Sequence, residues 1–236
     1  MSAFWRAMIF GGFGKGSSGG GGDTSIEDGM LDGTLKEYTN NRVTKLRNYA
    51  FYYSSLTFFA GENVTDVGVY CFQYSSLKNV HLPSAANIAA RSFQNCYSLE
   101  SISLPSLTTS ANHTYLLLNC KLLKNVDLPN MLYAKQGMFE GCLVLQEINL
   151  PSVVSMEAGL FKGSTVLKKV ILKHSEVVSL ANANAFENTP FAAGKAGGTV
   201  YVPQALIESY QNATNWSTLY AAGTCNFVAI EGSEYE

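Results

Sequence analysis

Apolar and polar residues alternate in five short segments of the chain. The alternating apolar pairs are Val80 and Leu82, Ile102 and Leu104, Val126 and Leu128, Ile148 and Leu150, and Val170 and Leu172. Alternation with a period of two predicts strands with one buried face and one face in water. A proline directly follows the first four segments, and because proline cannot donate to a β-ladder, we expect each strand to end there.

The alternating segments recur at a nearly constant interval. The run SLKNVHLPS at 76–84 returns as SLESISLPS at 98–106, LLKNVDLPN at 122–130 and VLQEINLPS at 144–152. From Leu77 to Leu167 the corresponding leucines are 22, 24, 22 and 22 residues apart. This interval is typical of a solenoid, in which each repeating unit stacks on its neighbours. Parallel strands stack about 4.8 Å apart, so six or seven units predict a sheet on the order of 30 Å long.

Phenylalanine recurs at a second position of the unit, and we expect these rings to stack as one column. They are Phe51, Phe72, Phe93, Phe139, Phe161 and Phe186. In the fourth unit Leu116 stands near this position, and two residues are added around 112–115, which predicts a local bulge.

Cysteine recurs at a third position. Cys96, Cys120 and Cys142 each lie three residues before a repeat leucine, and Tyr74 and Ser164 fill the same place in the flanking units. Equivalent positions stack along a solenoid, which predicts a buried ladder of small side chains. A disulfide between two stacked cysteines is the alternative.

The copy NIAARSFQNCYSLESISLPS at 87–106 resembles the BspA-like leucine-rich repeats of bacterial surface and secreted proteins. The resemblance covers most of residues 43–203. The ending GGTVYVPQALIESYQNATNWSTL at 197–219 is similar to the C-terminal cap of such arrays in proteins of gut Firmicutes and their phages. The resemblance implies a leucine-rich repeat solenoid: a right-handed β/α superhelix of six to seven repeats, with one short parallel strand per repeat, a convex side of loops or short helices, and a helical cap.

This organisation divides the chain into a tail, two caps and the repeats. We expect a flexible glycine-rich tail at 1–22, an N-terminal capping segment at 23–42, repeats at 43–196 and a C-terminal cap at 197–236.

The C-terminal cap has its own pattern. Pro203 is suited to the first turn of a helix, and Trp216 and Leu219 are expected to pack on the last repeat. Residues 225–231 read as an edge strand.

Composition excludes several classes of partner. Charged residues make up 14% of the chain and the net charge is −2, so no basic patch is available for nucleic acid or for anionic lipid. No apolar run approaches the roughly 20 residues that span a bilayer. The five cysteines form no CxxC pair, and the three histidines are far apart in the repeat, so neither a metal site nor a cofactor is expected.

Two motifs near the N-terminus do not support binding sites. Gly14, Gly16 and Gly19 match GxGxxG, but more glycines follow where a dinucleotide site needs a helix. A calcium loop counted from Asp28 would place Thr39 where a bidentate glutamate is required. Residues 1–10 lack a convincing signal-peptide cleavage site, so an extracellular, surface or virion-associated location is an expectation drawn from the resemblance.

The residues between the apolar strand positions are the candidate ligand-binding residues. They are predicted to form two outward columns: Asn79, Ser101, Asn125, Glu147 and Lys169 in one, and His81, Ser103, Asp127, Asn149 and Ile171 in the other. A sheet face that is merely solvated is the alternative. His81, Asp127 and Ser103 could be imagined as a triad, but adjacent rungs give no pocket that excludes water, so we expect no enzyme.

These observations predict a non-catalytic adhesion or recognition module that presents its polar sheet face to a protein or glycan ligand. The alternative is a structural component of a phage particle or of a bacterial surface assembly.

Overall fold

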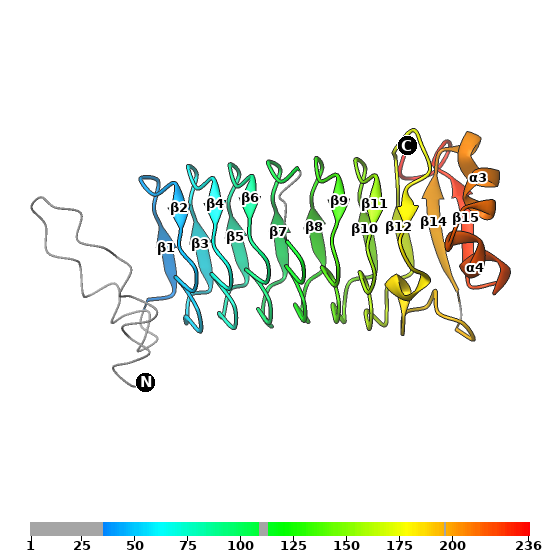
Figure 1. The fold of residues 1–236 in the computed structure, drawn as a ribbon. Coiled ribbons are helices and arrows are strands. Elements are labelled where there is room, and N and C mark those ends of the chain that lie inside the picture. The colour runs from blue at the N-terminus through cyan, green and yellow to red at the C-terminus, as the bar shows by residue number, and fades with distance from the viewer. Residues whose placement is uncertain (1–34, 109–112, 196) are drawn as a thin grey trace, which may run out of the picture.

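The computed structural model describes residues 35–108, 113–195 and 197–236, which form an elongated stack of coils (Figure 1). Each coil contributes a short strand to a parallel sheet along one side. The first five of these strands pair in the order β1-β3-β5-β7-β8, and the last four in the order β10-β12-β14-β15. Their bounds are Glu37–Thr39 (β1), Phe58–Ala60 (β3), Asn79–His81 (β5), Ser101–Ser103 (β7), Asn125–Asp127 (β8), Glu147–Asn149 (β10), Lys169–Ile171 (β12), Gly198–Val202 (β14) and Cys225–Ala229 (β15). The predicted leucine-rich repeat solenoid is confirmed.

Within residues 35–108, 113–195 and 197–236, six coils contain a second strand of two residues, where the resemblance implied one strand per repeat. These strands are Lys45–Leu46 (β2), Asp66–Val67 (β4), Asn87–Ile88 (β6), Tyr133–Ala134 (β9), Ser155–Met156 (β11) and Ser179–Leu180 (β13). They pair in two three-stranded parallel sheets, β2-β4-β6 and β13-β11-β9. Each strand buries only its second residue, and two residues are too short a run for an alternating pattern to predict a strand.

Stacking in register explains why equivalent residues share an environment. Asn79 lies opposite Ser101, and Ser101 lies opposite Asn125. The central residues Val80 and Ile102 point into the core and are buried, as predicted. The four strands that precede a proline each end two residues before it, also as predicted.

The phenylalanine column is confirmed. Phe51 and Phe72 stack with ring centroids 5.0 Å apart, Phe72 and Phe93 at 5.2 Å, and Phe139 and Phe161 at 5.5 Å.

Leu117, not Leu116, fills the gap in this column. The Phe93 N–H donates to the carbonyl of Leu116, and the Leu117 N–H donates to the carbonyl of Met138, which places Leu117 in the register of Phe93 and Phe139. Counting forward from the preceding repeat cannot fix this register, because the added residues come before it.

The cysteine position is a buried ladder with no disulfide. Cys96, Cys120, Cys142 and Ser164 are each fully buried, and all five cysteines of the chain are free thiols. Burial raises the pKa of the Cys96 and Cys142 thiols to about 12, so they stay protonated.

Ser75, not Tyr74, continues this ladder. The Ser75 hydroxyl lies 3.4 Å from the Cys96 sulfur. The spacing from Phe72 to Leu77 is one residue shorter than that from Phe93 to Leu99, so counting back from the leucine misses the position.

The C-terminal cap closes the core as predicted. It comprises a short 3-10 helix, Gln204–Leu206 (η2), two α-helices, Ile207–Asn212 (α3) and Trp216–Ala221 (α4), and β15, which pairs parallel to β14 at the edge. The 3-10 helix Ala183–Phe186 (η1) belongs to the last repeat. The Trp216 indole N–H donates to the carbonyl of Val178 at 2.7 Å, and the Val178 N–H donates to the Tyr210 hydroxyl at 2.9 Å. Both aromatic side chains are fully buried. Among the described residues, no helix is long and apolar enough to cross a membrane.

The predictions for the N-terminal segment fall partly outside the described residues. The glycine-rich tail, with its GxGxxG match, and the acidic segment before residue 35 lie there. Within the expected capping segment, β1 pairs in register with β3 as the first strand of the sheet.

Candidate binding face

The predicted outward columns lie on the exposed side of the long sheets. Six of their residues are exposed: Asn79, His81, Asn125, Asp127, Glu147 and Asn149. Ser101, Ser103 and Lys169 are half-buried.

Ile171 is an error in the predicted columns, since it is buried. It lies opposite Tyr201, whose ring packs against Tyr235 with centroids 4.7 Å apart. The face is therefore covered at its C-terminal end.

The sheet is interrupted between β8 and β10. Each of these strands is the last member of its own hydrogen-bonded sheet, although they follow one another in the stack. Val126, at the centre of β8, is only half-buried, whereas Ile102 and Ile148 on either side are buried. The interruption thus exposes part of the apolar interior.

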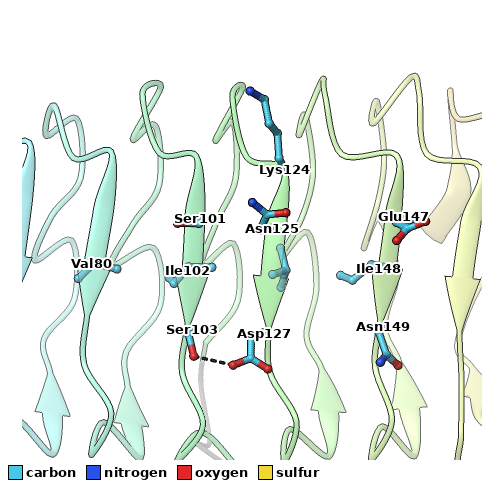
Figure 2. A pocket seen from close by; sticks show the side chains of 11 residues that line it. Val80, Ser101, Ile102, Ser103, Lys124, Asn125, Asp127, Glu147, Ile148 and Asn149 are labelled. Carbon is cyan, nitrogen blue, oxygen red and sulfur yellow. Dashed lines mark hydrogen bonds between the residues drawn. The ribbon is translucent and has the colours of Figure 1, made fainter. Parts of the chain in front are cut away.

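A hollow of about 380 Å³ lies over this interruption (Figure 2). Its floor is apolar, formed by Val80, Ile102, Val126 and Ile148. Its polar lining includes six of the nine candidate residues: Ser101, Ser103, Asn125, Asp127, Glu147 and Asn149. Lys124 stands at the rim, and Figure 2 shows its side chain directed away from Asn125 and Asp127.

Asn79, His81 and Lys169 do not line the hollow. The Ser101 hydroxyl donates to the side-chain oxygen of Asn79 at 2.6 Å. His81 Nε2 lies 3.0 Å from Glu62 Oε1, and both side chains are about half exposed.

The imagined triad is not assembled. The Ser103 hydroxyl donates to Asp127 Oδ2 at 2.6 Å, while His81 faces Glu62. A nucleophilic serine needs a histidine to accept its proton, and here the serine donates to a carboxylate. Among the described residues, no group of three or more histidine, cysteine, aspartate or glutamate side chains is placed to hold a metal ion.

The C-terminal residues fold back onto the face, which sequence reasoning missed. Lys169 Nζ donates to Glu234 Oε1 at 2.8 Å and to the Tyr235 hydroxyl at 2.9 Å. The Tyr235 hydroxyl donates to Glu147 Oε2 at 3.0 Å. The hydrogen bond to Glu234 raises the pKa of Lys169, and the same bond lowers the pKa of Glu234. Lys169 is thus engaged by residues of its own chain. The open part of the face begins at β10 and extends from there toward the N-terminal strands.

The sequence matches the family model described as BspA type leucine-rich repeat region, in six copies over residues 44–168 and 133–200. The chain belongs to the BspA-type leucine-rich repeat family. No curated protein matches it.

Three solved structures resemble this BspA-type chain. A leucine-rich repeat protein of T. pallidum is 24% identical with a TM-score of 0.52, and the match covers 62% of this chain and 70% of that one. A leucine-rich repeat protein of Bacteroides ovatus is 14% identical with a TM-score of 0.45, covering 84% and 58%. A leucine-rich cell surface protein of Faecalibacterium prausnitzii is 15% identical with a TM-score of 0.33, covering 69% and 59%. The first of these supports the repeat fold, and such folds are commonly protein-binding or surface modules.

Proposed function

We propose that this chain is a non-catalytic recognition module that binds a glycan in the hollow between β8 and β10. The observation that carries the proposal is the interruption of the sheet, because it opens a stretch of the polar face where an apolar floor is accessible. A volume of about 380 Å³ is within the range of small-ligand sites.

The lining suits a ligand rich in hydroxyl groups. Amides donate and accept, carboxylates accept, and hydroxyls do both, so Asn125, Asp127 and Glu147 can satisfy hydroxyls that themselves donate and accept. The half-buried Val126 offers an apolar contact for the C–H face of a sugar ring. The lining of the hollow contains no cluster of cationic side chains, which argues against a phosphorylated ligand.

Adhesion and exposure at a bacterial or virion surface are part of this proposal. They are supported by membership of the BspA-type family alone.

The test is a glycan array probed with the purified chain and with Asp127→Asn and Glu147→Gln. Hydrogen bonds to charged groups contribute about 1.5–3 kcal/mol, so each variant is expected to weaken a bound glycan by roughly tenfold or more. Glu208→Gln, an exposed glutamate of α3, is the matched control and is expected to bind as the original chain does.

Three results would contradict the proposal. These are an array without hits, glycans that bind the original chain and all variants equally, and a protein ligand whose binding depends on Asp127 and Glu147 when no glycan binds. The last result would assign the hollow to a protein.

A further inference from the structure

A second surface lies on the turns that follow the two-residue strands, away from the hollow. In each coil, two residues of this turn stand on either side of the phenylalanine position in sequence, and we call them the corners of the turn. Backbone hydrogen bonds place Tyr49 in the register of Tyr70 at the first corner, and Tyr53 in the register of Tyr74 at the second.

These corners require left-handed backbone conformations. Among the described residues, ten that are not glycine have positive φ, and four of them are asparagines, which tolerate this conformation. The other six are Tyr49, Tyr53, Tyr70, Tyr74, Arg91 and Tyr115, with φ between 55 and 61°. All six occupy the corners of the N-terminal coils.

The C-terminal coils have glycine at the same corners. Tyr115 is followed in register by Gly137 and Gly159. Asn119 is followed in register by Gly141 and Gly163. Glycine avoids the steric cost that a side chain meets in this conformation. Folding therefore does not explain the bulky residues, and retained strain of this kind is characteristic of functional positions.

The bulky residues form one connected surface. The rings of Tyr49 and Tyr70 stack at 5.1 Å, and the Arg91 guanidinium lies over Tyr70 and Tyr115, at 5.8 and 5.2 Å from their ring centroids. The Arg91 side chain also donates to the Tyr70 hydroxyl at 2.8 Å. We call the tyrosines from 49 to 115, with Arg91 and Lys121, the tyrosine ridge.

The ridge has two parallel rows of side chains, which we call files: the first runs from Tyr49 to Tyr115, and the second lies beside it. Tyr53 and Tyr74 stack at 4.5 Å, and Tyr97 follows at 6.2 Å with Lys121 Nζ 5.0 Å from its ring centroid. Tyr52 joins the two files, since its ring lies 5.6 Å from that of Tyr49 and 4.6 Å from that of Tyr53.

Tyr53, Tyr97 and Lys121 of the ridge are exposed and its other members are half-buried, and exposed apolar side chains lie on the turns beyond it. Tyr53 is 51% exposed and Tyr97 is 44% exposed. Leu122 and Leu143, on the turns of the next two coils, are 45% and 41% exposed. Contiguous exposed aromatic and apolar side chains mark interaction surfaces, and tyrosine and arginine dominate the binding energy of protein interfaces.

The charge of the ridge defines its partner. The four turn segments 47–56, 68–77, 89–99 and 113–123 contain Arg47, Arg91 and Lys121 but no aspartate or glutamate, whereas the next turn, which carries Leu143, contains Glu140. The cationic groups lie beside the rings, Arg91 over Tyr70 and Tyr115 and Lys121 over Tyr97, and these four segments supply no acidic side chain to neutralise them. This arrangement complements carboxylates.

We propose that the tyrosine ridge docks an acidic protein segment that also carries leucine or aromatic side chains. Exposed Leu122 and Leu143 favour a polypeptide over an acidic polysaccharide, because leucine or aromatic side chains bury more apolar surface on two leucines than the C–H face of a sugar ring does. The stacked rings also favour a polypeptide, because a sugar ring would need a free tyrosine face and the faces of Tyr53 and Tyr74 pack on one another. This inference does not depend on the glycan proposed for the hollow.

The experiment selects phage-displayed random twelve-residue peptides on the whole purified chain. The enriched peptides are expected to combine aspartate or glutamate with leucine, phenylalanine or tyrosine. Arg91→Gln and Tyr97→Ser are expected to weaken a selected peptide at least tenfold, more strongly at low salt. The matched control is Tyr220→Ser on α4, because Tyr220 is 42% exposed and lies outside the ridge.

Should Arg91→Gln reduce folding, Lys121→Gln replaces an exposed cation of the same ridge and is expected to weaken binding as well. Enriched peptides without acidic residues would overturn the inference, as would equal binding to the ridge variants and to the control. Binding of hyaluronate, an acidic polysaccharide, that is lost in Tyr97→Ser while no acidic peptide is selected would overturn it in favour of a glycan.

Discussion

The N-terminal and C-terminal coils share one backbone but differ in what they place on it. At the first corner of the turns, the coils up to Tyr115 carry tyrosine or arginine, whereas the next coils carry Gly137 and Gly159. On the sheet, the face is open from β5 to β10, whereas Glu234 and Tyr235 cover it at Lys169. The repeated residues determine the shape of a coil. Residues that this shape does not require are therefore the better guide to binding.

The largest expected effect tests what the two halves share. Phe72→Ala and Phe161→Ala each remove a fully buried ring from the stacked column, one in each half. Each is expected to lower the free energy of unfolding by about 3–5 kcal/mol, as for other buried aromatic truncations. Urea denaturation measures both. A loss in only one half would show that the column is not a common core.

The second effect isolates the corner conformation. Gly163 has φ +72°, and a Cβ added there meets no atom closer than 4.0 Å. Gly163→Ala is therefore expected to cost about 1–2 kcal/mol from the left-handed backbone alone.

A clash should add to that cost at the neighbouring corner. At Gly137 a Cβ would collide with the Tyr115 ring, so Gly137→Ala is expected to cost more than Gly163→Ala. Thermal unfolding of the two variants ranks them. Equal stability of Gly163→Ala and the original chain would remove the strain argument.

The smallest effect concerns the covered end of the face. Because the pKa of Glu234 is lowered in the folded chain, its contact with Lys169 contributes stability at neutral pH, and this is lost as the pH falls through the folded pKa of Glu234. Because the pKa of Lys169 is raised, the contact persists as the pH rises until Lys169 itself deprotonates.

Hydrogen exchange at residues 232–236 measures this contact. Protection is expected at pH 7 and is expected to fall in acid, whereas Lys169→Gln should lose it at both values. Protection that is unchanged by Lys169→Gln would contradict the pairing.

The repeating features of this molecule could be predicted from its sequence. Strand alternation, the phenylalanine column and the ladder of buried cysteine and serine recur in most copies, and stacking in register makes one copy inform the next. Errors of one residue, at Leu116 and Tyr74, arose where the copy length changes. A periodic pattern cannot locate its own insertions.

The features specific to one coil could not be predicted. The segments NVD of β8 and EIN of β10 follow the same pattern as their neighbours, so nothing local signals the interruption between them. Lys169 and Glu234 are 65 residues apart and outside any shared repeat. The ridge did leave a signal, since tyrosine recurs 21 residues apart at 49 and 70 and again at 53 and 74.

The double variant Tyr53→Asn, Tyr74→Asn tests the central claim most directly, with urea unfolding and affinity for a selected acidic peptide measured on the same protein. Relief of strain at two corners, about 1–2 kcal/mol each, offsets most of the loss of the four ring contacts that Tyr53 and Tyr74 make with each other, with Tyr52 and with Tyr97, about 0.5–1.5 kcal/mol each. The account predicts a fall in unfolding free energy of no more than about 2 kcal/mol together with at least tenfold weaker binding. A fall of more than about 2 kcal/mol in unfolding free energy with unchanged affinity would mean that the tyrosines serve the fold, and it would contradict the account.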